Sequence, residues 1–345
     1  MKIGKFDLNG NRTFIVAELS ANHGGRIAVA KQSIAAAKEI GADAVKLQTY
    51  TADTLTIDCE RDDFIISGGT LWDRRKLYDL YREAHLPWEW HAELFAYARE
   101  LGIEIFSTPF DRTAVDFLEQ FAPCACKIAS FEITDHDLIA YAAARGRPML
   151  ISTGIADEQE IADAVRICRA AGNHKIALLW CTSSYPAGPE DANLRTLPDL
   201  TARFGVVPGF SDHTRGLTAP IAAVALGARI IEKHFILDKS IGGPDAAFSL
   251  DRDEFAALVR AVRETEKLLG RIDYSLTEKK RENRRFARSL YVTADIARGE
   301  TATPENVRSI RPGFGLEPKF LPQILGRKAK ADYAAGTPVR REMFE

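Results

Sequence analysis

Apolar stretches of four to six residues alternate with longer amphipathic stretches eight times along the first 270 residues. Each short stretch is rich in Val, Ile, Leu or Phe and ends on polar residues, which is typical of buried parallel strands. The predicted strands are residues 14–19, 44–49, 104–108, 126–129, 149–153, 177–182, 206–211 and 230–235. The predicted helices include residues 27–40, 91–101, 158–171 and 216–226, each followed by a glycine that can end a helix. Eight strand–helix repeats of this length predict a (β/α)8 TIM barrel, an α/β fold.

An open, doubly wound sheet is the structural alternative, but no GxGxxG sequence follows the first predicted strand. Residues 50–90 are longer than an ordinary strand–helix loop, so we expect either a lid or wall of a substrate site or a solvated helix with ion pairs. An amphipathic helix over residues 255–269 closes the predicted barrel domain, residues 1–270. A charged linker over residues 271–285 follows, and the short apolar pieces of residues 286–345 predict a small second domain.

The composition of the 345-residue chain, 46% hydrophobic and 27% charged, is that of a soluble globular protein. Lys and Arg number 46 against 48 Asp and Glu, so no overall field favours nucleic acid or an anionic membrane. The N-terminus lacks the apolar core of a signal peptide, and no apolar run approaches the roughly 20 residues that span a bilayer. Five cysteines without a CxxC pair favour reduced thiols. We therefore expect a cytoplasmic protein with small-molecule partners.

Two histidines, His213 and His234, lie at the ends of two consecutive predicted strands. The carboxyl ends of parallel strands meet at the face of a barrel where active sites are built, and neighbouring strands lie about 4.8 Å apart. Two core histidines with satisfied hydrogen bonds are the alternative interpretation. Nearby Asp212, Glu232 and Asp245 favour a metal, because imidazoles combined with oxygen donors suit divalent ions. We predict Mn²⁺, with Mg²⁺, Co²⁺, Zn²⁺ and Fe²⁺ as alternatives.

Two lysines lie on other predicted strands, each among polar neighbours. Lys46 and Gln48 share one face of the second strand by alternation, and Lys127 has a matching position on the fourth. A buried lysine is costly unless it meets an anion, and two of them among hydroxyls suit the phosphate and carboxylate of one small molecule. Salt bridges within the barrel are the alternative for each lysine. Schiff-base chemistry at either lysine is disfavoured, because an enzyme that used it would not need the metal-binding histidine pair.

These strand ends together resemble the sialic acid synthase family over essentially the whole chain. The motifs that carry the resemblance are Glu18-Leu19-Ser20-Ala21-Asn22-His23, Lys46-Leu47-Gln48-Thr49, Ser107-Thr108-Pro109-Phe110, Lys127-Ile128-Ala129-Ser130-Phe131-Glu132, Ser152-Thr153-Gly154, Cys181-Thr182-Ser183-Ser184-Tyr185-Pro186, Ser211-Asp212-His213 and Glu232-Lys233-His234-Phe235. The family's architecture is a metal-dependent TIM barrel followed by a small antifreeze-like (SAF) domain. The first of these motifs and the stretch from Leu71 to Tyr78 look like the branch that makes pseudaminic acid.

The resemblance implies condensation of phosphoenolpyruvate (PEP) with an amino-sugar aldehyde. In that branch the sugar is 2,4-diacetamido-2,4,6-trideoxy-L-altrose, and the products are pseudaminic acid and phosphate. By the same analogy, the residues expected to contact PEP are Lys46, Thr108, Lys127, Ser130, Ser152, Ser184 and Ser211. Those expected at the reaction centre and the sugar are Tyr185, Glu132, Asp245, Glu18 and Gln48. Either Glu132 or Asp245 would orient or deprotonate a water. Arg311 would reach into the barrel mouth of the other subunit of a domain-swapped homodimer.

Three other functions stay open at this point. A synthase for legionaminic or N-acetylneuraminic acid would use a different sugar. A 3-deoxy-aldulosonate-phosphate synthase would need a phosphorylated sugar and has no SAF domain. A non-catalytic sugar-binding protein would release no phosphate from PEP.

Overall fold

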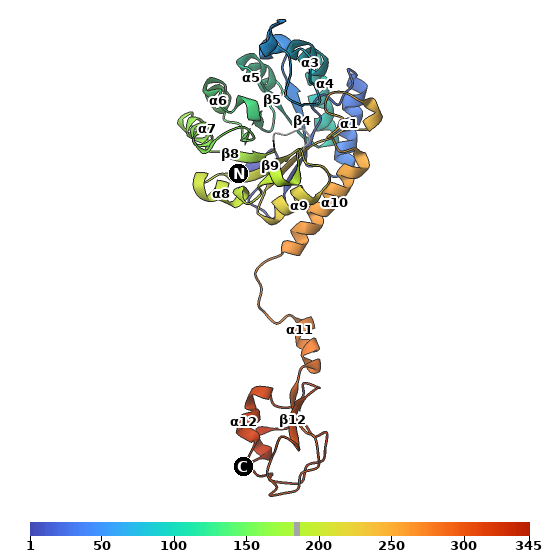
Figure 1. Ribbon diagram of the computed structural model, residues 1–345, viewed down its shortest axis with the longest axis vertical. Helices are drawn as coiled ribbons and strands as arrows, with labels where there is room; N and C mark the ends of the chain where they lie inside the picture. The colour runs from blue at the N-terminus through green and yellow to red at the C-terminus, as the bar shows by residue number, and fades with distance from the viewer. Residues whose placement is uncertain (183–186) are drawn as a thin grey trace. The chain divides into compact units, whose positions relative to one another are not determined.

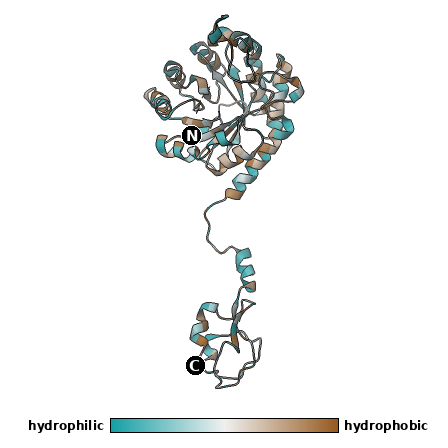
Figure 2. Ribbon diagram, in the orientation of Figure 1, coloured by the Kyte–Doolittle hydropathy of each residue, from teal (hydrophilic) through white to brown (hydrophobic). Residues whose placement is uncertain are grey.

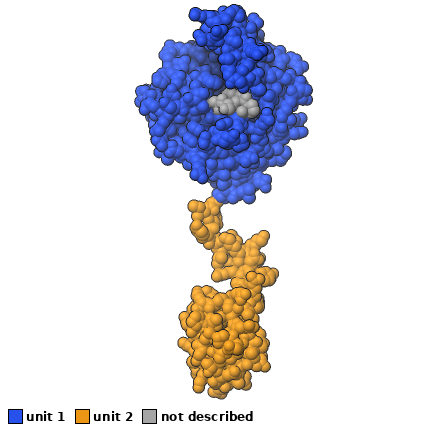
Figure 3. Space-filling view, viewed as in Figure 1, with its two compact units in different colours: residues 1–270 blue, residues 271–345 orange. Residues whose placement is uncertain are grey.

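The computed structural model describes residues 1–182 and 187–345. The chain divides into two compact units, Met1–Gly270 and Arg271–Glu345, which Figure 3 draws in separate colours. Each unit has its own hydrophobic core. The first unit contains all the strand ends at which the sequence predicts site residues.

Eight parallel strands close into a barrel in the order β10-β3-β4-β5-β6-β7-β8-β9, and helices surround them (Figure 1). The strands are β3 (Phe14–Glu18), β4 (Ala44–Thr49), β5 (Glu104–Pro109), β6 (Cys126–Ile128), β7 (Met149–Ser152), β8 (Ile176–Cys181), β9 (Val207–Asp212) and β10 (Ile230–His234). The predicted TIM barrel is therefore confirmed, and every predicted strand starts and ends within one residue of an observed one. The open-sheet alternative is excluded because β10 pairs with β3.

The barrel helices are α1 (Ile27–Glu39), α2 (Ala52–Leu55), α3 (Leu77–Ala84), α4 (His91–Leu101), α5 (Arg112–Glu119), α6 (His136–Ala143), α7 (Glu158–Ala170), α8 (Thr196–Phe204), α9 (Thr218–Ala225) and α10 (Arg252–Leu269). Short 3-10 turns are η1 (Asp62–Phe64), η2 (Trp88–Trp90), η3 (Ser130–Glu132), η4 (Pro189–Ala192) and η5 (Lys239–Ile241). Polar and apolar residues share the same helices in Figure 2, as expected when one side of a helix covers the strands. Local sequence fixes several helix ends: Asp251 accepts from the backbone N–H of Glu254 and starts α10, and Gly102 ends α4 in a left-handed conformation.

The barrel interior has an apolar layer beneath a polar one. The apolar layer includes Phe14, Val16, Ala44, Phe106, Leu150, Ala177, Leu179 and Ile230. A short hairpin, β1 (Lys2–Ile3) with β2 (Phe6–Asp7), packs Ile3 into this layer. The sequence analysis missed this hairpin because two-residue strands carry no periodic signal. Since side chains alternate along a strand, the inward residues that follow the apolar layer form the site.

The insertion between β4 and α4 carries the expected ion pairs and also contacts the barrel. Its outer surface carries ion pairs, including Lys76 with Asp58 and Glu60. Its inner surface reaches the loop after β10, where the Trp72 Nε1 donates to the Pro244 backbone oxygen at 3.1 Å. The insertion thus belongs to the rim of the barrel mouth.

The second unit is built on β11 (Ser289–Val292) and β12 (Val307–Ile310), which pair antiparallel. Its helices are α11 (Glu278–Asn283) and α12 (Leu321–Ile324), with 3-10 turns η6 (Arg284–Phe286), η7 (Pro318–Phe320) and η8 (Arg341–Met343). The core includes Leu290, Val292, Ile296, Val307, Ile324, Val339 and Phe344. In neither described part of the chain is there a helix long and apolar enough to cross a membrane.

Candidate active site

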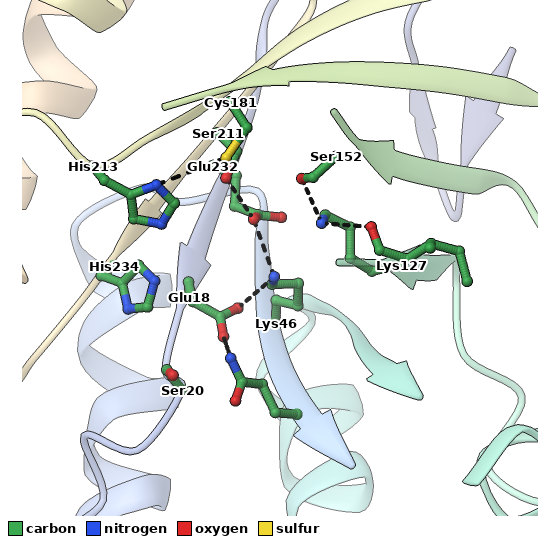
Figure 4. Close-up of polar contacts among 12 residues, drawn as sticks. Glu18, Ser20, Lys46, Lys127, Ser152, Cys181, Ser211, His213, Glu232 and His234 are labelled. Atoms are coloured by element: carbon green, nitrogen blue, oxygen red, sulfur yellow. Dashed lines mark hydrogen bonds and ion pairs between the residues drawn. The ribbon is translucent and has the colours of Figure 1, made fainter. Parts of the chain in front are cut away.

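The polar layer gathers side chains from strands that are distant in sequence. Strand register places Glu18 of β3 beside Lys46 of β4 on one side and His234 of β10 on the other. Glu232 of β10 is likewise level with Ser211 of β9. All five residues face the barrel interior, as Figure 4 shows for their side chains. The alternation that the sequence displays therefore converts eight separate strand ends into one cluster.

Lys46 lies between two carboxylates in this cluster. Its Nζ is 3.1 Å from Glu18 Oε2 and 3.0 Å from Glu232 Oε1 (Figure 4). Burial disfavours the charged lysine, but the two carboxylates outweigh that effect and raise the pKa of Lys46. Burial raises the pKa of Glu18 to about 7, whereas Lys46 and Lys127 overcome burial at Glu232 and lower its pKa to about 2. The sequence analysis left two interpretations of this lysine, a ligand-binding cation and a salt bridge within the barrel, and the structure shows the salt bridges.

Lys127 has a different environment. Its Nζ donates to Ser152 Oγ at 2.6 Å and to the Ile128 backbone oxygen at 3.0 Å. Among the described residues it forms no ion pair, and burial lowers its pKa to about 8. A buried ammonium with neutral partners gains most from an incoming anion. Lys127 is therefore the stronger anion-binding candidate of the two lysines.

Hydroxyl groups lie around these lysines. Ser211 Oγ donates to Glu232 Oε1 at 3.1 Å, and Ser130 Oγ accepts from the Gly154 N–H at 3.2 Å. Thr108 Oγ1 is buried on β5 and has no hydrogen-bond partner among the described residues. A buried hydroxyl without a partner is costly, so a ligand oxygen is expected to satisfy it.

The two histidine rings lie side by side, with their centroids 5.2 Å apart (Figure 4). The His213 Nδ1 is 2.7 Å from the Thr182 backbone oxygen, which fixes Nδ1 as the donor and leaves the lone pair on Nε2. His234 Nδ1 is buried and has no hydrogen-bond partner in the described part of the chain. Burial, and then His213, lower the pKa of His234 well below its usual value, so its ring is neutral. Burial lowers the pKa of His213, but Cys181 and the Thr182 backbone oxygen outweigh burial and raise it. Two imidazoles side by side, each with a ring nitrogen that can act as a ligand when deprotonated, fit a divalent metal ion.

Of the three carboxylates expected near the histidines, Asp245 lies beside His234, whereas Glu232 and Asp212 pair with lysines. Asp245 Oδ2 lies 3.9 Å from His234 Nδ1 and accepts a hydrogen bond from Ser20 Oγ. Asp212 faces away from the barrel interior and pairs with Lys233, so its expected place beside a metal is wrong. Alternation explains this outcome, because Asp212 lies between the inward residues Ser211 and His213. The described residues contain no group of three or more His, Cys, Asp or Glu side chains with metal-binding geometry.

Glu132 lies in η3, just after β6. Its Oε2 is buried and has no hydrogen-bond partner among the residues that the structure describes. Burial raises the pKa of Glu132 to about 7, although Lys127 acts in the opposite direction. A carboxyl group with this pKa can give or take a proton near neutral pH.

Comparisons with known proteins agree with this geometry. The NeuB family model matches residues 33–274, and the SAF domain model matches residues 287–345. The chain belongs to the NeuB family. Two relatives named pseudaminic acid synthase cover it almost completely: one from Campylobacter jejuni is 50% identical over 100% of both chains, and one from Helicobacter pylori is 49% identical over 96% of this chain and 97% of its own. The crystal structure of an N-acetylneuraminic acid synthetase from Leptospira borgpetersenii in complex with citrate has a TM-score of 0.73 at 31% identity, covering 82% of this chain and 94% of that one.

The NeuB barrel thus brings most predicted site residues to one mouth. The residues that the structure places in the polar layer or on the loops directly above it are Glu18, Lys46, Gln48, Thr108, Lys127, Ser130, Glu132, Ser152, Ser211, His213, His234 and Asp245. Ser184 and Tyr185 lie outside the described residues. Arg311 is exposed and belongs to the second unit, beside the end of β12.

Two residues of this NeuB site, Ser20 and Cys181, had no assigned role in the sequence analysis. Ser20 donates to Asp245, and Cys181 Sγ lies 3.8 Å from His213 Nδ1. Glu232, which was expected near a metal, pairs with Lys46. Burial at Cys181 is outweighed by His213, which lowers the pKa of the thiol to about 7. Alternation could have found Cys181, since it is two residues from Leu179, which faces the barrel interior. No periodic signal marks Ser20, because it lies in a turn with a positive φ of 43°.

Proposed function

We propose that this chain condenses PEP with 2,4-diacetamido-2,4,6-trideoxy-L-altrose to form pseudaminic acid and release phosphate. The observation that carries the proposal is the buried polar layer, in which two lysines and several hydroxyls lie beside a histidine pair. The end-to-end likeness to relatives named pseudaminic acid synthase supports the choice of sugar. The enzyme class is then a PEP-dependent transferase that forms a carbon–carbon bond.

PEP carries a phosphate and a carboxylate, and the site offers two cations for them. Lys127, which has neutral partners, binds one anionic group with Ser152 beside it. Lys46 binds the other anionic group of PEP. To do so its ammonium gives up part of its ion pair with Glu18, because the negative charge of PEP takes the place of that carboxylate. Thr108, Ser130, Ser211 and Ser184 supply hydroxyl donors to the same molecule. Their main contribution is to hold PEP in a reacting position.

His213 and His234 are the residues that would hold a divalent metal ion, for which we propose Mn²⁺, with Mg²⁺ or Co²⁺ as substitutes. The buried, unpartnered Nδ1 of His234 and the oriented ring of His213 fit such an ion. The metal would polarise the aldehyde oxygen of the sugar. Besides the two imidazoles, oxygen atoms of substrate, water or Asp245 would serve as further ligands.

The reaction forms one carbon–carbon bond and one carbon–oxygen bond, from C2 of PEP to the oxygen of water, and breaks the carbon–oxygen bond to phosphate. C3 of PEP attacks the aldehyde carbon, whose oxygen takes up a proton, and positive charge develops at C2 of PEP. Water adds to C2 and loses a proton, and phosphate then leaves from the resulting tetrahedral carbon as the C2 hydroxyl gives up its own proton to the departing phosphate and becomes the ketone. We assign the orientation and deprotonation of this water to Glu132, because its Oε2 is unpartnered and its pKa is about 7. Asp245 is held by Ser20 on the side of the histidines, where it meets the sugar with Glu18, Gln48 and Tyr185.

The second unit completes the proposal. We propose that residues 271–285 link the barrel to the SAF domain and that Arg311 reaches the barrel mouth of the other subunit in a domain-swapped homodimer. The exposed apolar side chains of Ile272 and Tyr274, 90% and 95% accessible, are consistent with a segment that a second copy covers. We further propose a cytoplasmic location, in keeping with five free cysteines.

A substrate panel tests the function. The full-length protein is incubated with Mn²⁺, PEP and, in separate reactions, the sugar precursors of pseudaminic, legionaminic and N-acetylneuraminic acid. Mass spectrometry identifies the nine-carbon product, and phosphate release gives the rate. We expect kcat/KM for the L-altrose derivative to exceed the others by at least about 10-fold. A higher kcat/KM for either of the other sugars would contradict the proposed substrate. If no phosphate is released with any of the three sugars, the proposed enzymatic activity is contradicted.

A further inference from the structure

A second buried ion pair lies directly behind the histidines. Asp212 and Lys233 are Cα partners on β9 and β10, one residue away from His213 and His234. Asp212 Oδ2 and Lys233 Nζ are 2.5 Å apart, and both side chains are completely shielded from solvent. Both face the helix layer, so neither can touch a substrate in the barrel mouth.

Thr214 closes this pair into a network. The other carboxylate oxygen of Asp212 accepts from the Thr214 N–H at 2.8 Å and from its Oγ1 at 2.7 Å. The Lys233 ammonium donates to the Thr214 backbone oxygen at 2.6 Å. The residues on both sides of His213 are therefore fixed to the strand that carries His234.

Stability alone is a weak explanation for this network. The neighbouring outward positions on the same strands hold Phe210, Ile231 and Phe235, which pack in the apolar layer between strands and helices. A buried ion pair is often no better for stability than apolar residues of similar volume, because both charges must be removed from water. What the pair supplies beyond apolar packing is a fixed geometry, since its hydrogen bonds define the distance between two chain segments.

We propose that Asp212 and Lys233 are positioning residues for the metal centre, an inference that rests on the metal part of the proposed function. They hold β9, the turn at Thr214 and β10 so that the imidazoles of His213 and His234 keep the separation at which both bind one ion. A second contact, from His213 Nδ1 to the Thr182 backbone oxygen, sets the rotation of one ring. The ion pair sets the spacing between the two ligands. Residues that support metal ligands from behind commonly change metal affinity by about 10- to 100-fold.

The test uses the double variant Lys233→Met with Asp212→Leu, which removes both charges, leaves neither one unpaired and keeps a similar volume. Mn²⁺ binding to the full-length protein is measured by isothermal titration, and folding by thermal unfolding and circular dichroism. We expect a folded protein whose Kd for Mn²⁺ is about 10- to 100-fold weaker. We also expect kcat to recover toward the wild-type value at saturating Mn²⁺, because no group that touches the substrate has changed. Wild-type Mn²⁺ affinity in a folded double variant would overturn the proposal.

Thr214→Val provides a milder test if the double variant does not fold. It removes only the hydroxyl that donates to Asp212, and it should weaken Mn²⁺ binding by about 3- to 10-fold with little change in folding. Unchanged affinity in Thr214→Val, where it is the sole folded variant, counts against the proposal. As a matched control, Arg263→Met with Asp43→Asn removes another largely buried ion pair, far from the histidines along the strands; it should change stability and leave Mn²⁺ affinity unaltered. If the wild-type protein binds no divalent ion while still making product, the metal centre and this inference both fail, but the condensation itself stands.

Discussion

Lys46 Nζ lies 3.0 Å from Glu232 Oε1, and this contact separates the roles of the two lysines in the barrel. Lys46 has its charge balanced by Glu232 and Glu18, whereas Lys127 meets only the neutral oxygens of Ser152 and Ile128. Lys46 therefore stabilises the buried carboxylates in the absence of substrate. Lys127, which has no carboxylate partner among the described residues, can bind an anionic group of the substrate.

Replacing each lysine by methionine should reveal this difference. Lys127→Met removes a buried cation that lacks a carboxylate, so the free energy of unfolding should stay equal or rise, while KM for PEP rises by about 100-fold or more, equivalent to some 3 kcal/mol. Lys46→Met leaves Glu18 and Glu232 buried without a cation, and should cost about 3–5 kcal/mol of stability. Urea unfolding and PEP saturation curves measure the two effects. Lys38→Met, on the exposed face of α1, is the control; equal stability losses for Lys46 and Lys127 would contradict the assignment.

Glu132 should make the stability of the barrel depend on pH. Burial raises its pKa from 4.5 to about 7 in the folded state, so the folded protein binds the extra proton more tightly than the unfolded chain. The resulting stabilisation is complete below about pH 4.5 and disappears as pH rises through 7, by at most about 3 kcal/mol. Urea unfolding of the wild type and of Glu132→Gln between pH 5 and 8 measures it. The variant should show a smaller loss across this window, and parallel curves would refute the shift.

The same variant should lose turnover. If Glu132 takes the proton from water, kcat of the wild type rises as pH increases through about 7, and Glu132→Gln should lower kcat by about 100-fold or more. Glu89→Gln, at an exposed position in η2, serves as the control. If Glu132→Gln shows the same dependence of kcat on pH as the wild type, another residue is the base.

His213→Ala and His234→Ala should each abolish bound Mn²⁺ and turnover. Each removes one of two imidazoles that lie 5.2 Å apart, and a single remaining ligand holds a divalent ion poorly. Metal content after gel filtration and phosphate release measure the loss. The exposed His174, in the loop before β8, can be changed to Ala as a control without effect. Full activity of the wild type after exhaustive chelation would contradict a metal-dependent reaction.

Arg311→Ala should raise KM for the sugar more than KM for PEP, because the arginine is proposed to face the sugar. Arg308→Ala, on the exposed side of β12, is the control. Mixing Arg311→Ala with Lys127→Met subunits tests whether the arginine acts across the dimer. Random reassociation should restore about a quarter of wild-type activity, because half of the dimers are mixed and each has one complete site. No recovery would place the arginine in its own subunit's site or exclude the swap.

Gly209→Ala should destabilise the barrel by about 1–3 kcal/mol. A Cβ at this inward position of β9 would lie 2.3 Å from Leu179 Cδ2 and 3.0 Å from Ile230 Cβ, inside the apolar layer. Thermal or urea unfolding measures the change. Gly10→Ala, where the nearest atom is the Asp7 backbone oxygen at 3.5 Å, should have little effect. A similar stability for both variants would show that the layer can repack.

The sequence by itself determined the barrel and most of the residues that face its interior in the polar layer. Eight apolar stretches with glycine-ended helices between them leave few other folds, and alternation from one inward residue identifies the next, as from His234 back to Glu232. These features are local, since strand pairing and side-chain direction repeat every two residues.

Only the tertiary structure decided how these residues pair. Three contacts illustrate this: Lys46 with Glu18 and Glu232, Asp212 with Lys233, and Trp72 of the insertion with Pro244. Each depends on strand register and barrel closure, which bring together segments separated by 21 to 186 residues. No local pattern encodes such distances, because the energy that selects them comes from burying charges and rings together once the barrel has closed.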